Sequence, residues 1–285
     1  MFRKTIIIAA IAALYCGSAN AQHTKLLGCG DTIATERVAF DENEIVKYTV
    51  TYSASFIKAE VADITFSTTA DRYMGRKCYK IEAVAVTRPF YAIFFPLNDV
   101  YTTWVSQQTL RPVKATSFQH EGDYRFRTAL DFHYHNRIAR TEGHDLRHNT
   151  TRRHTLVLND CSYDALSLFY NLRSADLSTL QNGQSQSLSL VLEDTVRTVR
   201  FRFIKREIQK LSNIGSFRTV KFACQFATTN DEAFHDGAEF YIWLSDDDNR
   251  IPIYLESPIR VGKVYAKLNQ WSGLKNPFSS IVIND

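Results

Sequence analysis

The sequence predicts an all-β protein, either a large antiparallel β-barrel or an open barrel-like sheet, with one amphipathic helix covering an end or a face. Apolar and polar residues alternate with a period of two in many segments between Ile45 and Gln270, as they do in half-buried antiparallel strands. These segments do not alternate regularly with helical ones, which argues against a parallel sheet of βαβ units. Aromatic residues make up 13% of the chain, and such side chains supply much of the buried area of β cores.

Residues 1–21 are expected to be a cleaved secretory signal peptide. A basic start is followed by an apolar stretch (residues 5–15) and by small residues at 19–21. The apolar stretch is too short for an ordinary membrane span, and no later segment has ~18 consecutive apolar residues. Lipid modification of Cys16 is the alternative, although Tyr15 directly before it does not fit such a signal. We therefore expect an exported protein, in the periplasm or associated with the outer membrane, without a transmembrane helix in its mature chain.

Residues 22–285 are expected to form a single β-rich domain, because no internal repeat or Pro/Gly-rich linker divides them. The first 21 residues carry two basic groups and no acidic ones, which leaves 32 basic and 30 acidic groups, a net charge of +2. This balance argues against a nucleic-acid partner, since nucleic-acid binders usually present a basic stripe.

The mature chain would keep four cysteines, whose spacing lacks the close CxxC pairs of zinc or thioredoxin-like sites. In an oxidising compartment four thiols allow up to two disulfides, with three connectivities. Buried free thiols are the alternative. The four residues are Cys29, Cys78, Cys161 and Cys224.

The expected strands follow one another along most of the chain. Segment 45–53 places Val46 and Tyr48 on one face, and segment 124–135 alternates for longer, up to His135. Segment 198–207 alternates with one slip near Ile204. Further strands are expected at 221–229, 239–245, 251–257 and 263–271.

One segment, residues 161–177, has helical periodicity instead. Ser162 is placed to cap the first turn, and Arg173 lies near the end, where a cation suits the helix dipole. We expect the apolar stripe to pack on the core, with a ligand-gating role as the alternative. The stripe consists of Ala165, Leu168, Phe169 and Leu172.

The segment "RPFYAIFFPLNDVYTTW" (residues 88–104) is the most suggestive one for binding. Pro89 and Pro96 disfavour a regular central strand and predict a loop or a short helical turn. A loop this apolar must be buried in the core, contact a partner or a membrane surface, or line a cavity. Core burial is the simplest interpretation, and a pocket for a ligand is the alternative. The candidate ligand-binding residues are Phe90, Tyr91, Phe94, Phe95, Tyr101 and Trp104.

Three short motifs resemble those of a family of bacterial exported proteins of unknown function. They are Trp243, Ser245, Asp246, Asp247, Arg250 and Pro252 near the C-terminus; Asp164, Leu166, Ser167, Tyr170, Leu172 and Arg173 in the expected helix; and Thr109-Leu110-Arg111-Pro112. The resemblance implies a large antiparallel β-barrel-like fold, similar to the YmcC-like lipoproteins linked with capsule export. It implies no activity.

Asp246-Asp247-Asp248 raises the question of a metal or acid–base site. An EF-hand loop needs a glycine at its sixth position, where this chain has Ile251, so that motif fails. A turn is expected instead, because Asp and Asn side chains bond nearby backbone amides, with Arg250 pairing with one aspartate. His133 and His135 are expected to share a strand face, but a zinc site needs a complete ligand set. No metal or cofactor is therefore expected.

The function that these features favour is non-catalytic binding of an apolar, lipid or glycan-containing ligand by an exported cell-envelope protein. Hydrolase and phosphate-loop signatures are missing, which favours a binding protein over an enzyme and gives no catalytic residues. The alternatives are a scaffold that docks another envelope protein and a hydrolase of an envelope polymer.

Overall fold

The computed structural model describes residues 29, 32–178, 180–212, 214–226 and 239–283. The expected signal peptide lies outside these residues. The helices are α1 (Pro89–Ala92) and α2 (Ala165–Arg173), and short 3-10 turns lie at Thr35–Arg37 and Tyr134–Asn136. The strands are β1 (Ile45–Ala54), β2 (Ile57–Tyr73), β3 (Arg76–Thr87), β4 (Asn98–Ser106), β5 (Pro112–Glu121), β6 (Tyr124–His133), β7 (Ile138–Asp145), β8 (Thr150–Val157), β9 (Ser162–Tyr163), β10 (Ser185–Val191), β11 (Val196–Leu211), β12 (Gly215–Phe226), β13 (Glu239–Ser245), β14 (Pro252–Pro258), β15 (Lys263–Ser272) and β16 (Ile281–Val282).

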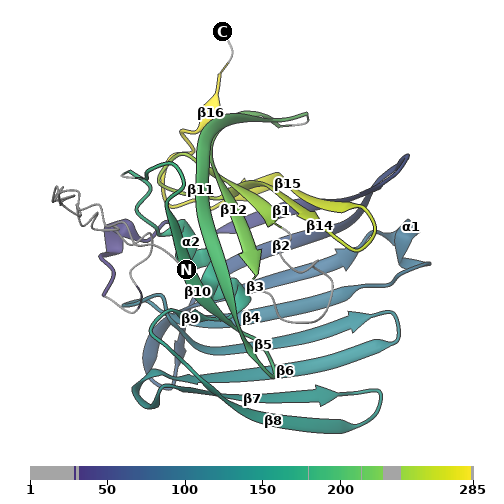
Figure 1. Ribbon diagram of the computed structural model, residues 1–285, viewed down its shortest axis with the longest axis vertical. Coiled ribbons are helices and arrows are strands. Elements are labelled where there is room, and N and C mark those ends of the chain that lie inside the picture. The colour runs from purple at the N-terminus through teal and green to yellow at the C-terminus, as the bar shows by residue number, and fades with distance from the viewer. Residues whose placement is uncertain (1–28, 30–31, 179, 213, 227–238, 284–285) are drawn as a thin grey trace, which may run out of the picture.

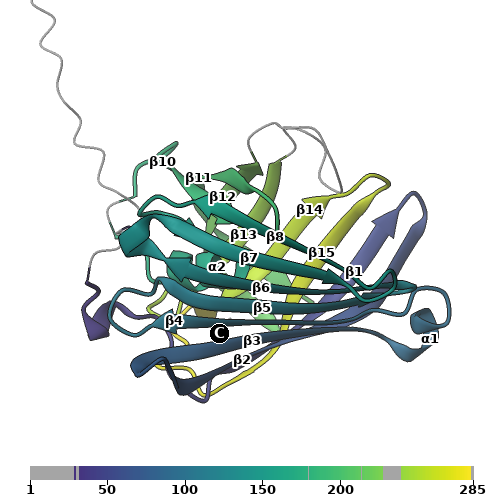
Figure 2. The same ribbon diagram turned by 90° about the horizontal axis from the view of Figure 1, so that it is seen from below.

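All these strands belong to one curved, open sheet, which confirms the predicted all-β, barrel-like fold (Figures 1 and 2). The strand order is β8-β7-β6-β5-β4-β3-β2-β1-β15-β14-β13-β12-β11-β10-β9, and β16 pairs with β12. Neighbouring strands are antiparallel, apart from β9 and β10. The sheet does not close by backbone pairing, but the β10–β11 turn lies against β7, where the Thr141 hydroxyl donates to the Glu193 carbonyl.

The slip predicted near Ile204 is confirmed, because the β11–β12 register shifts between Phe203 and Lys205. The alternation predicted up to His135 ends earlier. Strand β6 stops at His133, and the following 3-10 turn removes His135 from the strand face. The two histidines therefore do not lie side by side on one face as expected.

Helix α2 packs on the inner face of the curved sheet, which agrees with the expected helix covering an end or a face (Figures 1 and 2). Leu168 and Leu172 pack with the β10–β13 part of the sheet, whereas Leu166 and Tyr170 pack with β3 and β4. The residue that caps α2 is Asp164, not Ser162, because its carboxylate accepts from the amides of Leu166 and Ser167 at 3.0 and 3.3 Å. None of the helices in the described ranges is long and apolar enough to cross a membrane.

The antiparallel order places the turns at two ends of the molecule. We call the end with the β1–β2, β3–β4, β5–β6 and β14–β15 turns the rim, and the end with the β2–β3, β4–β5 and β13–β14 turns the base. Helix α2 starts level with the middle of β4, where Asp164 bonds Thr103, and runs toward the base, where Arg173 meets Glu44. The helix thus fills the half of the interior near the base and does not extend into the half near the rim.

Candidate ligand-binding cavity

The rim half of the interior holds a cavity of about 500 Å³. Its wall comes from β2 to β6 and from the β10–β11 turn, and its floor is the start of α2, residues 164–166. Most of the lining is apolar. The lining residues include Ile64, Phe66, Ala83, Ala85, Ala115, Phe126, Leu130, Val191 and Leu192.

Small side chains at inward-facing positions create this space. Along β3, alternate residues point inward, so Tyr79 and Ile81 fill the base half and are followed by Ala83 and Ala85 beside the cavity. On β5, the small inward-facing residues beside the cavity are Ala115 and Ser117. The sheet is therefore hollow where its inward residues change from large to small.

A few polar groups interrupt the apolar wall. The Asp164 carboxylate accepts hydrogen bonds from the hydroxyls of Thr103 and Ser167 at 2.8 and 2.6 Å, and burial raises its pKa. The Tyr101 hydroxyl accepts a hydrogen bond from the Gln119 amide at 3.0 Å, and burial also raises the pKa of this tyrosine. These side chains are already paired within the wall.

Glu193 is different, because its Oε1 atom is buried and finds no hydrogen-bond partner among the described residues. Its carboxylate lies against the backbone of Gly143, where a Cβ atom would clash with Oε1. Burial raises the pKa of Glu193, and neighbouring Asp194 raises it further. Of the two carboxyl groups in the cavity lining, Asp164 and Glu193, the latter has one oxygen without a partner among the described residues.

The six candidate residues of the Phe-rich segment lie in three places and do not form one site. Phe90 and Tyr91 are on α1, and Phe94 and Phe95 follow it at the rim, where Phe94 is 76% exposed. They are not packed in the core as the simplest interpretation expected. The other two residues, Tyr101 and Trp104, face opposite sides of β4.

Tyr101 lines the cavity, whereas Trp104 lies on the outer surface and donates to Asp71 at 2.8 Å. Residues three apart on a strand point to opposite faces, so their spacing alone already separated them. Only Tyr101 of the six belongs to the cavity wall.

The aspartate cluster forms the turn between β13 and β14. Asp247 organises it: its carboxylate accepts from the Ser245 hydroxyl at 2.8 Å and from the amides of Asn249 and Ser280 at 3.0 and 3.1 Å. The side chain is built into the turn and does not splay into solvent. In the part of the chain that the structure describes, no group of three or more His, Cys, Asp or Glu side chains is placed to hold a metal ion.

Residues of the same turn also bind the C-terminal end of α2. Arg173 is fully buried and makes a two-pronged contact with Glu44, at 2.6 and 2.8 Å, and donates to the Asn249 carbonyl at 3.0 Å. Arg250 in turn donates to the Arg173 carbonyl at 3.2 Å. Sequence reasoning missed Glu44, because it lies 129 residues from its partner and no local pattern marks it.

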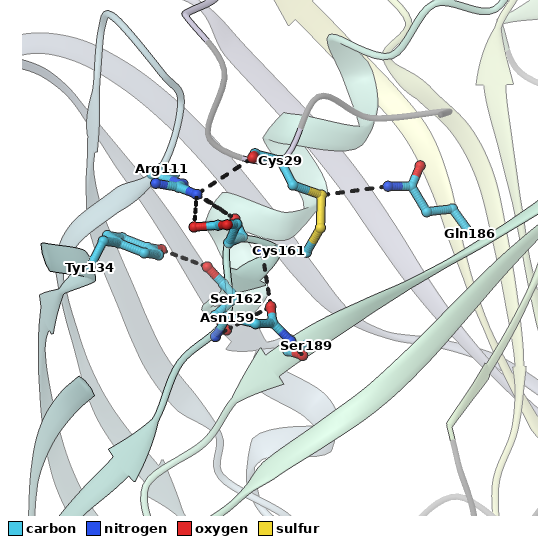
Figure 3. Close-up of a disulfide and its surroundings, with 9 residues drawn as sticks. Cys29, Arg111, Tyr134, Asn159, Cys161, Ser162, Gln186 and Ser189 are labelled. Atoms are coloured by element: carbon cyan, nitrogen blue, oxygen red, sulfur yellow. Dashed lines mark hydrogen bonds and ion pairs between the residues drawn. A yellow bond between two sulfur atoms is a disulfide. The ribbon is translucent and has the colours of Figure 1, made fainter. Parts of the chain in front are cut away.

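Cys29 and Cys161 form a disulfide, whereas Cys78 and Cys224 are buried free thiols (Figure 3). Both alternatives considered for the cysteines thus occur together. Arg111 stabilises the bridge region, since it donates to the carbonyl and carboxylate of Asp160 at 2.9 and 2.8 Å. The motif around Arg111 thus lies at the base, as do the end of α2 and the β13–β14 turn.

A family model described as a protein of unknown function, DUF3108, matches residues 47–269, from β1 to β15. The chain belongs to the DUF3108 family. This confirms the family of unknown function that the motifs resemble, and the family description states no activity. No match was found among curated proteins.

The DUF3108 chain is similar to a solved β-barrel-like protein of the domain of unknown function DUF1849 from Brucella abortus. The two share 10% identity with a TM-score of 0.54, over 83% of this chain and 100% of the other, which supports the fold alone. A hypothetical protein, CT021, from Chlamydia trachomatis aligns over 89% of this chain and 98% of its own, at 8% identity and a TM-score of 0.31, and carries no argument.

Proposed function

We propose that this DUF3108 protein binds a lipid-like molecule, inserting an apolar chain into the cavity, and that it does so without catalysis. The observation that carries the proposal is the hollow, mostly apolar rim half of the interior, about 500 Å³ in volume. That volume lies within the range of small-molecule sites, about 300–1,000 Å³, which are typically apolar with a few placed polar groups.

The lining favours a lipid over a glycan. A sugar needs many hydrogen-bond partners, because burying its hydroxyl groups unpaired is costly. Asp164 and Tyr101 are already paired within the wall, so the polar contacts for a ligand would come from a few other lining groups, among them Ser117, Thr128 and Glu193. A single polar head on an apolar chain fits this distribution.

Export to the cell envelope is the second part of the proposal. The basic start, the apolar stretch and the small residues of segment 1–21 support a secretory signal. The Cys29–Cys161 disulfide also supports it, since disulfides persist in oxidising compartments. The proposed location is the periplasm or the periplasmic side of the outer membrane.

Filling the cavity tests the binding proposal. Ala85→Trp would place an indole in the cavity, and Val86→Trp, on the outer face one residue later, is the matched control. Displacing even two methylenes of a bound chain costs roughly tenfold in affinity. We expect Ala85→Trp to bind the fluorescent fatty acid cis-parinaric acid at least about tenfold more weakly than the delipidated native protein, and Val86→Trp to bind it equally.

Circular dichroism and thermal melting would establish that both variants are folded. Uptake by a folded Ala85→Trp variant equal to that of the native protein would contradict the cavity as the binding site. Uptake lost in both variants would show that the probe binds elsewhere on the sheet.

A further inference from the structure

The rim turns expose large apolar side chains to solvent. Phe56, at the tip of the β1–β2 turn, is 93% exposed, and Val261, in the β14–β15 turn, is 65% exposed. The residues of this kind in the rim turns or at the adjoining strand ends are Phe56, Ile57, Phe90, Ile93, Phe94, Phe95, Tyr124 and Val261. At the base end, Met74, Val157 and Ile283 are also exposed, at 86%, 78% and 83%, but they lie on three separate elements.

These turns are neighbours in space. Gly262 lies directly against the backbone of Ser53, which joins the β14–β15 turn to the β1–β2 turn. The Gly122 amide donates to the Pro96 carbonyl at 2.7 Å, which joins the β5–β6 turn to the segment after α1. The tips of β1 and β2 and helix α1 extend toward the same side in Figure 2. The exposed residues therefore gather at one end of the sheet in two pairs of joined turns, which we call the apolar band, and exposed apolar patches usually mark an interaction surface.

The charges beside the band differ from turn to turn. Segments 54–59, 88–98 and 258–263 contain four basic residues and no acidic ones, whereas the β5–β6 turn carries Glu121 and Asp123. Arg88 is paired with Asp63 and Glu60, at 2.9 and 2.6 Å, and Lys263 is paired with Glu256. Lys58 and Arg260 have no acidic partner within 4.0 Å in the part of the chain that the structure describes.

The band is continuous with the entrance of the cavity. Tyr124, the first residue of β6, is part of the band and also belongs to the cavity lining. Its ring stacks on that of Phe126, deeper in the cavity, with 5.7 Å between the ring centroids. An apolar path thus leads from the outside of the rim into the interior.

We propose that the rim is a membrane-docking surface that inserts its apolar turns into the interfacial region of a bilayer with anionic lipid headgroups. Protruding aromatic and aliphatic tips flanked by unpaired cations fit such a surface, since apolar burial and attraction to anionic lipids both contribute to interfacial binding. A bilayer is favoured over a folded protein partner because the exposed apolar groups sit at the tips of several turns, beside the unpaired cations Lys58 and Arg260. Docking of the rim to a bilayer does not depend on a ligand in the cavity. Transfer of a lipid chain between the bilayer and the cavity rests on the proposed function.

Flotation of the full mature chain with vesicles tests the inference. The probes are vesicles of phosphatidylcholine alone and of phosphatidylcholine mixed with phosphatidylglycerol. We expect the native protein to float with the mixed vesicles, and the Ile93→Ser/Phe94→Ser variant to bind them roughly tenfold more weakly. Met74→Ser, an equally exposed change at the base, should float like the native protein.

A second variant separates charge from apolar burial. The Lys58→Gln/Arg260→Gln variant should no longer prefer vesicles that contain phosphatidylglycerol. It should bind mixed vesicles only as strongly as it binds vesicles of phosphatidylcholine alone. Equal flotation of the native protein and the Ile93→Ser/Phe94→Ser variant would overturn the proposal. Absence of flotation, together with a dimer in light scattering that the same variant abolishes, would overturn it too and assign the rim to self-association.

The Ala85→Trp variant keeps this test distinct from that of the cavity. Its rim is unchanged, so it should float with mixed vesicles while losing cis-parinaric acid uptake. If Ala85→Trp loses uptake and still floats, both proposals are supported. If Ala85→Trp keeps uptake while the Ile93→Ser/Phe94→Ser variant loses flotation, only the cavity site is refuted. Flotation lost by Ala85→Trp would mean that the rim does not dock independently.

Discussion

Two carboxyl groups in the cavity wall show how a residue's partners decide its role. Asp164 accepts hydrogen bonds from hydroxyl and amide donors and caps α2, so these contacts give its carboxylate a structural role. Glu193 has a buried oxygen without a partner among the described residues, and an unpaired buried polar atom is costly. Glu193 also lines the cavity, so its carboxyl group is one of the polar groups near which the head of a bound lipid would lie.

The pH dependence of stability should reveal the buried state of Asp164. Burial raises its pKa above the ordinary value of 3.8, so the folded state holds this proton more tightly than the unfolded chain does. Stability from this group therefore falls as pH rises from 3.8 toward the raised pKa of the folded state. We expect the free energy of unfolding of the native protein to fall relative to that of Asp164→Asn over that window, in urea denaturation at a series of pH values.

Asp63→Asn provides a control of opposite sign. A hydrogen bond from Arg88 lowers the pKa of Asp63 below 3.8, so its contribution is present above that pH and is lost as pH falls through the lowered value. The stability difference between the native protein and Asp63→Asn should therefore grow as pH rises. A difference for Asp164→Asn that stays constant with pH would contradict its buried, titrating state.

At the scale of elements, α2 is the part that determines where the interior is filled. Its apolar residues pack against both halves of the sheet, and its last turn is held by Glu44 before β1 and by the β13–β14 turn. Because the helix starts at mid-height, it closes the base and leaves the rim hollow. Several residues of the short motifs, such as Arg173 and Arg250, thus position this helix.

Removing the charge of Glu44 should test that anchoring. Glu44→Gln leaves the buried guanidinium of Arg173 facing a neutral partner, and breaking a buried ion pair in this way costs about 3–5 kcal/mol. Glu256→Gln breaks a more exposed pair with Lys263 and should cost about 0–1 kcal/mol. Chemical denaturation measures both, and equal losses of stability would contradict a special role for the buried pair.

Local features of these elements could be predicted, whereas their long-range partners could not. Period-two alternation predicted β1 and β6, and turn chemistry predicted the turn at Asp246-Asp247-Asp248, because both depend on residues close in sequence. The cap of α2 was placed at Ser162, two residues too early, since Ser and Asp are both good caps and only the start of the helix distinguishes them. The pairing of Arg173 with Glu44 needed the fold itself.

At the scale of the whole molecule, the sheet explains why the cavity was not predictable. Small residues such as Ala85 and Ala115 occur on many strands, and only the register of β2 to β6 brings them together around one space. The Phe-rich segment was recognised as unusual, but its exposure at the rim depends on where the β3–β4 turn lies. The sequence thus pointed to the Phe-rich segment, and the topology places most of that segment at the rim and only Tyr101 in the cavity wall.

The most direct measurement of the central claim is native mass spectrometry of the protein isolated from its own host, before and after solvent extraction. We predict an added mass in the native protein that extraction removes, with the extract containing a lipid. The same preparation of Ala85→Trp should lack this mass, and Val86→Trp should keep it. A native protein with only the mass of its own chain, or an added mass that Ala85→Trp retains, would contradict lipid binding in the cavity.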